Sequence, residues 1–164
     1  MGFTIERLRA SDWPQAAAIY AEGIATGNAT LETEMPPWEK WDAEHLPDCR
    51  LAARDGEAIL GWAALTPVSS RCVYGGVAEL SVYVAARARR QGVGRALVMA
   101  IIAASEEAGL WTLQGHILRE NMESLALMAA CGFRQVGIRE RLGQLHGVWR
   151  DVVLVERRSD RAGQ

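Results

Sequence analysis

The segment Arg89–Ala96, which reads RRQGVGRA, constrains this chain more than any other. It joins a predicted strand over 77–84 to a predicted helix over 93–108, whose apolar residues recur at helical spacing. A helix N-terminus carries unpaired N–H groups and a partial positive charge, so it binds anions. Gly92 and Gly94 let the backbone approach a phosphate closely, and the arginines add charge-assisted hydrogen bonds. We therefore expect a phosphate or pyrophosphate site at this turn.

Other phosphate-binding patterns fit this turn poorly. A P-loop needs a lysine after its second glycine, and none follows here. The dinucleotide pattern G-x-G-x-x-G needs a third glycine where Leu97 stands, and it usually opens its domain instead of following half of it. A glycine-rich helix start decorated with solvated arginines remains the alternative without a ligand.

The patterns along the rest of the chain predict one mixed α/β domain. A length of 164 residues is enough for one hydrophobic core. We expect the domain over 1–157 and a flexible tail over 158–164. Alternation and turn residues predict strands around 3–5, 50–54, 57–66, 77–84, 111–118, 133–141 and 148–155. Helices are predicted after a capping box of Asp12 and Gln15, around Trp38 and Trp41, and over 93–108 and 121–131.

Composition and charge indicate which partners and which cellular compartment to expect. A net charge of -2 gives no reason to expect a nucleic acid or an anionic membrane as partner. The longest apolar run, 96–104, is too short to cross a bilayer, and the first residues do not resemble a signal peptide. Three scattered cysteines argue against a disulfide framework and a zinc site. We expect a cytoplasmic protein without a metal, whose thiols are reduced and mostly buried.

Arg89, Gly92 and Gly94 fill the fixed positions of [QR]-x-x-G-x-[GA], so the turn resembles the acetyl-CoA signature of the GNAT superfamily of N-acetyltransferases. The order of predicted elements is also similar to that superfamily along nearly the whole chain. The resemblance implies an α/β (α+β) fold with a mixed sheet of about seven strands flanked by about four helices. It also implies acetyl-CoA as co-substrate, held by Val82, Val84, Arg89, Arg90, Gln91, Gly92, Val93, Gly94, Arg95, Asn121 and Ser124.

Within that superfamily the chain resembles the phosphinothricin, methionine sulfoximine and arsinothricin acetyltransferases. The likeness rests on the turn above and on three further stretches: 24–33, where Leu31 replaces the usual Phe, 71–84, and 146–151. It implies transfer of acetyl to the α-amino group of a small amino-acid-like molecule by a homodimer. A polyamine, an aminoglycoside or a protein N-terminus remains possible as acceptor. A non-catalytic acyl-CoA sensor and a nucleotide-binding module are the alternatives outside this chemistry.

Acetyl transfer to an amine needs a base and an N–H donor for the oxyanion. The resemblance gives these roles to Glu79 and to the backbone of Val82, and we expect burial to raise the pKa of Glu79. A solvent-facing strand glutamate is the alternative for Glu79. His146 either assists proton transfer or is a loop residue. Many members of the superfamily have a tyrosine as general acid at the position of Met128, so here the thiolate must be protonated another way or leave as such.

For the acceptor, Arg71 could hold an α-carboxylate through its guanidinium. Tyr74 and Glu32 could flank the amine, with Thr30 and Leu31 beside them; loop-surface positions are the alternative for these side chains. Three tryptophans (Trp38, Trp41 and Trp62) either wall the pocket or pack in the core. His116, in the middle of a strand, is expected to be structural, and His45, at a helix end, to be solvated.

Overall fold

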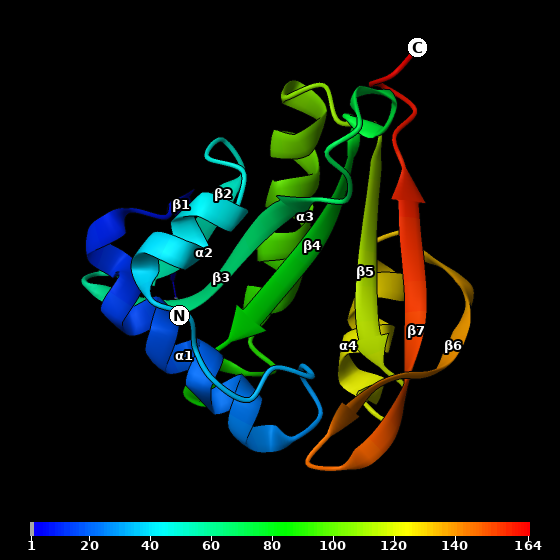
Figure 1. The fold of residues 1–164 in the computed structure, drawn as a ribbon. Coiled ribbons are helices and arrows are strands. Elements are labelled where there is room, and N and C mark those ends of the chain that lie inside the picture. Colours follow the sequence, from blue (N-terminus) through cyan, green and yellow to red (C-terminus); the bar gives the residue numbers. More distant parts are fainter. Residues whose placement is uncertain (1) are drawn as a thin grey trace.

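The computed structural model describes residues 2–164 and contains one seven-stranded sheet (Figure 1). The sheet has the order β1-β2-β3-β4-β5-β7-β6. Its strands are β1 (Thr4–Arg7), β2 (Arg50–Asp55), β3 (Ala58–Pro67), β4 (Val77–Val84), β5 (Thr112–Leu118), β6 (Arg134–Leu145) and β7 (Val148–Arg158). The α-helices are α1 (Trp13–Thr26), α2 (Trp38–Glu44), α3 (Val93–Glu107) and α4 (Met122–Ala130). This confirms the predicted fold class and the predicted order of elements.

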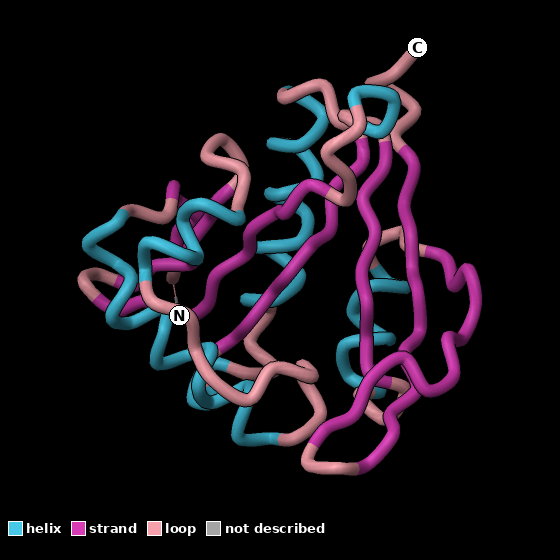
Figure 2. The backbone as a smooth tube through the Cα atoms, in the orientation of Figure 1, coloured by secondary structure: helices cyan, strands magenta, loops and turns pink. Residues whose placement is uncertain are grey.

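The junction of β4 and β5 divides the sheet. All neighbouring strands are antiparallel except these two, which run parallel and pair only from Val77–Glu79 to Thr112–Gln114. Beyond Glu79 the two strands diverge, as the backbone trace shows (Figure 2). The divergence leaves the last half of β4 with one free edge, and it opens a wedge in the middle of the sheet.

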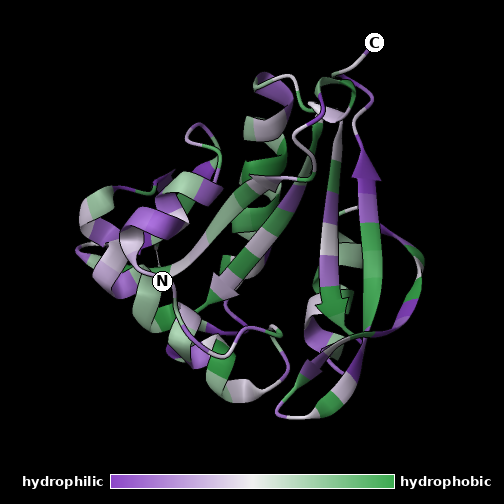
Figure 3. Cartoon of the chain, in the orientation of Figure 1, coloured by the Kyte–Doolittle hydropathy of each residue, from purple (hydrophilic) through white to green (hydrophobic). Residues whose placement is uncertain are grey.

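The two faces of β4 meet different helices. On one face, the ring of Tyr83 packs so closely on Gly23 of α1 that a Cβ at Gly23 would lie 2.8 Å from it. On the other face, Val84 packs near Gly94 of α3. The apolar stripe of α3 lies against the sheet (Figure 3), and its Leu97 and Ile101 are fully buried. Glu79 and Ser81 share a face with Tyr83, because side chains alternate along a strand.

A cluster of aromatic rings fixes α1 and α2 to the sheet. Trp41 lies 5.3 Å from Trp13, 5.7 Å from Trp38 and 5.6 Å from Trp62 between ring centroids. These tryptophans therefore pack in and around the core and do not line the cleft described below. His45 stacks on Trp41 at 3.9 Å and is half-buried, so the expectation that His45 is solvated is wrong.

Asp12 is the N-cap residue of α1, as predicted, but its side chain makes no capping hydrogen bond, so the capping box predicted from Asp12 and Gln15 is wrong. Asp12 lies in a one-turn 3₁₀ segment, and its carboxylate accepts hydrogen bonds from the backbone of Arg9 and from Arg54, each at 2.8 Å. Gln15 instead accepts a hydrogen bond from the backbone N–H of Ile59 at 2.8 Å. Both side chains are engaged by more distant parts of the chain, which local spacing could not indicate.

The last hairpin is longer than predicted. The predicted end of β6 at Arg141 coincides with a positive φ of 52° at that residue and with a shift of register between Arg139 and Gly143. The strand continues past this bulge to Leu145. The strand β7 extends to Arg158, one residue into the segment expected as a tail. No helix among residues 2–164 is both long and apolar enough to span a membrane.

Candidate active site

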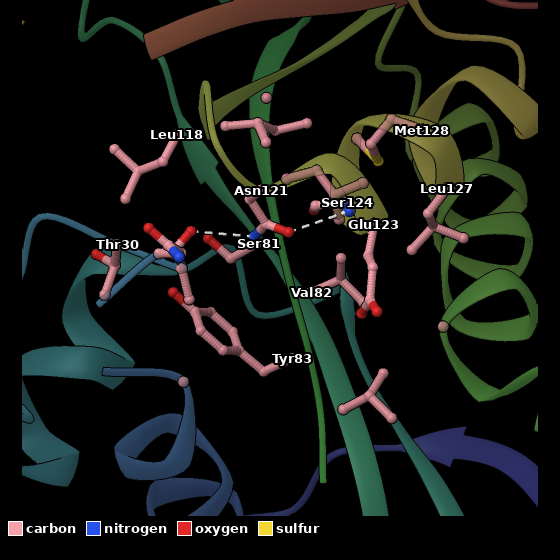
Figure 4. A pocket seen from close by; sticks show the side chains of 18 of the residues that line it. Thr30, Ser81, Val82, Tyr83, Leu118, Asn121, Glu123, Ser124, Leu127 and Met128 are labelled. Carbon is pink, nitrogen blue, oxygen red and sulfur yellow. Dashed lines mark hydrogen bonds between the residues drawn. The ribbon is translucent and has the colours of Figure 1, made fainter. Parts of the chain in front are cut away.

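The wedge between β4 and β5 is the mouth of a cleft of about 870 Å³. That volume lies in the range of small-ligand sites. Its walls come from the end of α1 and the segment after it, from β4 and β5, from the start of α3, and from α4 (Figure 4). Residues from opposite ends of the sequence therefore line one continuous space.

The start of α3 forms one end of the cleft. Gly92 has a φ of 83°, which favours glycine, and the first intrahelical hydrogen bond of α3 runs from Ala96 N–H to Gly92 C=O at 3.0 Å. The N–H groups of residues 93–95 precede that bond, so they are free to bind an anion. Gly94 has a second reason to be small, because a Cβ there would lie 3.2 Å from Leu127 of α4. The expected phosphate-binding geometry is therefore present.

Three arginines, Arg89, Arg90 and Arg95, line this end of the cleft. Arg90 is largely exposed and pairs with Glu123 at 3.3 Å, an arrangement weak enough for a phosphate to displace. Gln91 is different: its amide donates to the backbone oxygen of Arg87 at 3.1 Å, and it does not line the cleft. Of the residues predicted to hold acetyl-CoA, all except Gln91 are cleft residues.

The free edge of β4 runs along the cleft. The C=O of Gly76 accepts from the N–H of Thr112 on β5 at 3.1 Å, so the backbone of Gly76 faces β5. Along a strand, the backbone groups of alternate residues point to the same edge. The N–H groups of Val82 and Val84 therefore point toward the β5 side of β4, as the backbone of Gly76 does. At their level β5 has diverged, so these N–H groups point into the cleft, where a thioester carbonyl or an amide of a pantetheine arm could accept from them.

Glu79 lies where the two strands part. It is half-buried, and its Oε1 accepts hydrogen bonds from Gln114 at 3.1 Å and His116 at 2.6 Å. Burial raises the pKa of Glu79, but these hydrogen bonds more than offset burial and hold that pKa below its ordinary value. The expected upward shift is therefore wrong, and Glu79 is a carboxylate at neutral pH.

His116 is a cleft residue that sequence reasoning missed. Besides its contact with Glu79, its Nε2 lies 3.5 Å from the guanidinium of Arg139 on β6. The structure thus places His116 at the cleft, and whether its role is purely structural stays a prediction. A signal was present in the sequence: Gln114 and His116 are polar residues at alternate positions of an otherwise apolar central strand, so they share one face.

The wall beside Glu79 is mostly apolar with a few hydroxyls. It includes the predicted acceptor residues Thr30 and Leu31 from the segment after α1, and Ser81, Leu118 and Leu142, which the sequence did not indicate. Tyr83 stacks on Tyr20 with ring centroids 4.9 Å apart, and burial raises the pKa of the Tyr83 hydroxyl. Figure 4 shows Thr30, Ser81 and Tyr83 on the same side of the cleft.

Besides Gln91, four predicted site residues do not line the cleft formed by residues 2–164. Arg71 and Tyr74 lie in an exposed turn before β4, where the guanidinium lies 5.6 Å from the ring. Glu32 is exposed on the segment after Leu31. His146 is exposed in the turn between β6 and β7, with a φ of 49°. Their roles in binding or proton transfer stay predictions.

Polar contacts cross the rim of the cleft. The guanidinium of Arg150 on β7 donates to the C=O of Gly27 at 2.8 Å and to the side chain of Asn28 at 2.7 Å. Asn121 donates to the C=O of Asn28 at 3.1 Å and also caps α4 by accepting from Ser124 N–H at 3.2 Å. These contacts, which we call the rim bridge (Gly27, Asn28, Asn121 and Arg150), tie the end of α1 to the far half of the sheet.

Comparison with known proteins agrees with this geometry. The profile of the acetyltransferase (GNAT) family matches residues 6–133. A phosphinothricin N-acetyltransferase from Alcaligenes faecalis is 38% identical over 165 residues, covering 94% of this chain and 81% of that protein. An L-methionine sulfoximine/L-methionine sulfone acetyltransferase from Pseudomonas paraeruginosa is 28% identical, covering 95% of this chain and 94% of that protein.

Solved structures share the fold. A phosphinothricin acetyltransferase from Sinorhizobium meliloti in complex with acetyl-CoA superposes with a TM-score of 0.87 at 26% identity, covering 99% of this chain and 91% of that one. The structure of yncA from Salmonella typhimurium, with its cofactor acetyl-CoA, superposes with a TM-score of 0.89 at 20% identity, covering 100% of this chain and 98% of that one. Family profile, sequence relatives and fold lead to one conclusion: this chain is an acetyltransferase and belongs to the GNAT family.

Proposed function

We propose that this chain transfers the acetyl group of acetyl-CoA to the α-amino group of a small amino-acid-like acceptor of the phosphinothricin or methionine sulfoximine type. The observation that carries the proposal is the arrangement of the cleft. The free N–H groups at the start of α3 lie at one end, the open edge of β4 runs along it, and the carboxylate of Glu79 lies where β4 and β5 part. The names of the relatives support the class of acceptor.

In the proposed reaction the acceptor nitrogen attacks the thioester carbon of acetyl-CoA. A C–N bond forms, the C–S bond breaks, and CoA leaves as the thiolate. The N–H of Val82 stabilises negative charge on the carbonyl oxygen. Glu79, ionised at neutral pH, attracts the acceptor ammonium and takes its proton directly or through a water. The second N–H proton leaves the tetrahedral intermediate for the departing thiolate or for solvent.

Departure of the thiolate does not depend on a tyrosine. Met128 lines the cleft at the position where many relatives carry that acid, and its thioether has no proton to donate. A thiol pKa of about 8.5 makes the thiolate a good leaving group without prior protonation.

A thiol-release assay with a panel of amines tests the proposal. The panel contains phosphinothricin, methionine sulfoximine, plain amino acids, spermidine and an aminoglycoside, each with acetyl-CoA. We expect turnover confined to the first two. Turnover of spermidine or the aminoglycoside would show that the acceptor is a cationic amine and not an amino-acid-like molecule. Binding of acetyl-CoA without turnover of any amine would favour a non-catalytic acyl-CoA sensor.

We also propose that the protein is a homodimer. The hairpin of β6 and β7 exposes apolar side chains that a monomer would leave in water: Val136, Ile138, Val148 and Trp149 are each between 45% and 60% exposed. A second copy, which presents the same surface, would cover them by an isologous contact.

A further inference from the structure

Two side chains of β5 hold Glu79, and the reaction described above uses neither. Gln114 lies opposite Glu79 in the register of β4 and β5, and His116 lies two residues further on the same face of β5. The side chains of His116 and Glu79 are 26% and 32% exposed, so both are partly shielded from water. The cluster therefore lies at the wall of the cleft and is not part of the solvated surface.

The hydrogen bonds to Glu79 are unevenly distributed between its two oxygens. His116 Nδ1 and Gln114 Nε2 both contact Oε1, at 2.6 and 3.1 Å. Within residues 2–164, Oε2 has no hydrogen-bond partner. One oxygen is thus fixed from behind, while the other stays available to a group in the cleft.

The neighbours of His116 determine which of its nitrogens carries the proton. A carboxylate only accepts, so Nδ1 carries hydrogen and donates to Glu79. A guanidinium only donates, so Nε2, which lies 3.5 Å from Arg139, presents its lone pair. The neutral Nδ1–H form of the imidazole satisfies both contacts. His116 therefore orients the carboxylate of Glu79 through Nδ1. Its other nitrogen, Nε2, faces Arg139, so we do not assign His116 the role of base.

We propose that His116 is a positioning residue for acetyl transfer, which holds Glu79 ionised and leaves Oε2 free for the acceptor amine. The proposal rests on the role of Glu79 as base given above. Hydrogen bonds to a carboxylate stabilise its charged form, whereas burial opposes that form. Without the donor at His116, only Gln114 would oppose the effect of burial on Glu79. The carboxylate of Glu79 would then become protonated at a higher pH.

The other charged groups around the pair set the background for a pH experiment. Arg139 on β6 is the charged neighbour in contact with His116. Further along the cleft are Tyr83 on β4, Glu123 on α4, and the arginines at the start of α3: Arg89, Arg90 and Arg95. All of these stay unchanged in the variants below, so a difference in profile reports on the exchanged donor.

The test is the pH profile of kcat/KM for the acceptor in His116→Phe and His116→Asn. Phenylalanine keeps a ring but removes the donor, and asparagine carries an N–H close to the position of Nδ1. We expect the acid limb of the His116→Phe profile to lie at higher pH than that of the wild type. At a pH below both limbs, kcat/KM should then fall about tenfold for each pH unit that the limb moves. His116→Asn should keep most of the wild-type profile. A loss of equal size at every pH in His116→Phe, with no movement of the limb, would overturn the proposal.

Two further variants separate this proposal from the proposed function. Glu79→Gln with full activity would remove Glu79 as base. Glu79→Gln without activity, together with a wild-type profile in His116→Phe, would leave the function intact and reject the role of His116. If His116→Phe does not fold, Gln114→Met removes the other donor to Oε1, and its acid limb should move in the same direction by less; an unmoved limb would count against the proposal.

Discussion

The carboxylate that we propose as the base, Glu79, lies where β4 stops pairing with β5. It is the last residue of β4 that pairs with β5, so its side chain is anchored on one side while the strand edge beyond it is free. The same break in pairing leaves the N–H of Val82 without a partner on β5 and begins directly after Glu79. The positions of the proposed base and of the proposed oxyanion donor therefore both follow from one feature of the backbone.

The substitution Glu79→Gln should lower kcat by about 100-fold or more, because general base catalysis contributes that much. The KM for acetyl-CoA should stay about the same, since the groups predicted to hold it lie elsewhere in the cleft. Steady-state kinetics with phosphinothricin measures both. Glu57→Gln, at an exposed turn, is the matched control and should behave as wild type. An unchanged kcat in Glu79→Gln would contradict the assignment.

Site features formed by residues near one another in the sequence could be predicted, whereas side-chain contacts between different strands could not. Gly92 and Gly94 form a local turn, and the motif around Glu79 lies within one strand. The contact between His116 and Glu79 depends on the register of two strands that are far apart in the sequence. The lowered pKa of Glu79 follows from that same contact, so sequence reasoning that considered burial alone gave the wrong direction.

At the scale of elements, the rim bridge keeps the end of α1 close to β7 and to the start of α4. Arg150 is its main donor, and its side chain is only 13% exposed. It also pairs with Glu120 at 3.1 Å, a contact that lowers the pKa of that carboxyl. The bridge links the segment after α1 to the far half of the sheet beside the cleft, so we expect it to set the width of the cleft there.

Arg150→Ala should raise the KM for acetyl-CoA by about three- to tenfold, or about 0.7–1.4 kcal/mol, the usual net contribution of one hydrogen bond. The measurement is steady-state kinetics with acetyl-CoA varied at saturating acceptor. Arg134→Ala, which removes an exposed ion pair with Glu156 on the same hairpin, is the control and should leave KM unchanged. Equal KM values in the two variants would show that the bridge does not shape the cleft.

Close packing of β3 on β4 makes a second prediction. A Cβ at Gly61 would lie 2.8 Å from the backbone oxygen of Tyr83 and 3.1 Å from Leu97. Gly61→Ala should therefore destabilise the fold by about 1–3 kcal/mol, the usual effect of overpacking. Gly137→Ala, where nothing lies within 4 Å, is the matched control. Thermal unfolding of both variants tests this, and equal melting temperatures would contradict it.

Periodicity and turn residues predicted the order and the type of the helices and strands. The exact ends of these elements could not be predicted as well, because the ends depend on contacts with distant parts of the chain. The strand β6 passes Arg141 because a bulge absorbs that residue and pairing with β7 resumes at Gly143. The start of α1 directly after Asp12 was predicted, but the capping box does not form because the Asp12 carboxylate pairs with Arg54, far along the chain.

At the scale of the whole molecule, the exposed apolar hairpin predicts self-association. Light scattering should give a mass of twice 17.9 kDa. Ile138→Asp places a charge in the middle of that surface and should give a monomer, because burying an unpaired charge is costly. Met99→Asp, which changes an equally exposed apolar residue on α3, should leave the dimer intact. A wild-type monomer would contradict the proposed dimer.

The measurement that tests the central claim most directly is the stoichiometry of one reaction. The protein is incubated with acetyl-CoA and phosphinothricin or methionine sulfoximine, while free CoA thiol is titrated and the acceptor is analysed by mass spectrometry. We predict one acetyl group on the α-amino nitrogen of the acceptor for each thiol released, and we predict that Glu79→Gln forms both products about 100-fold more slowly. Release of thiol without an acetylated acceptor, or an acceptor acetylated equally well by Glu79→Gln, would contradict this account of the cleft.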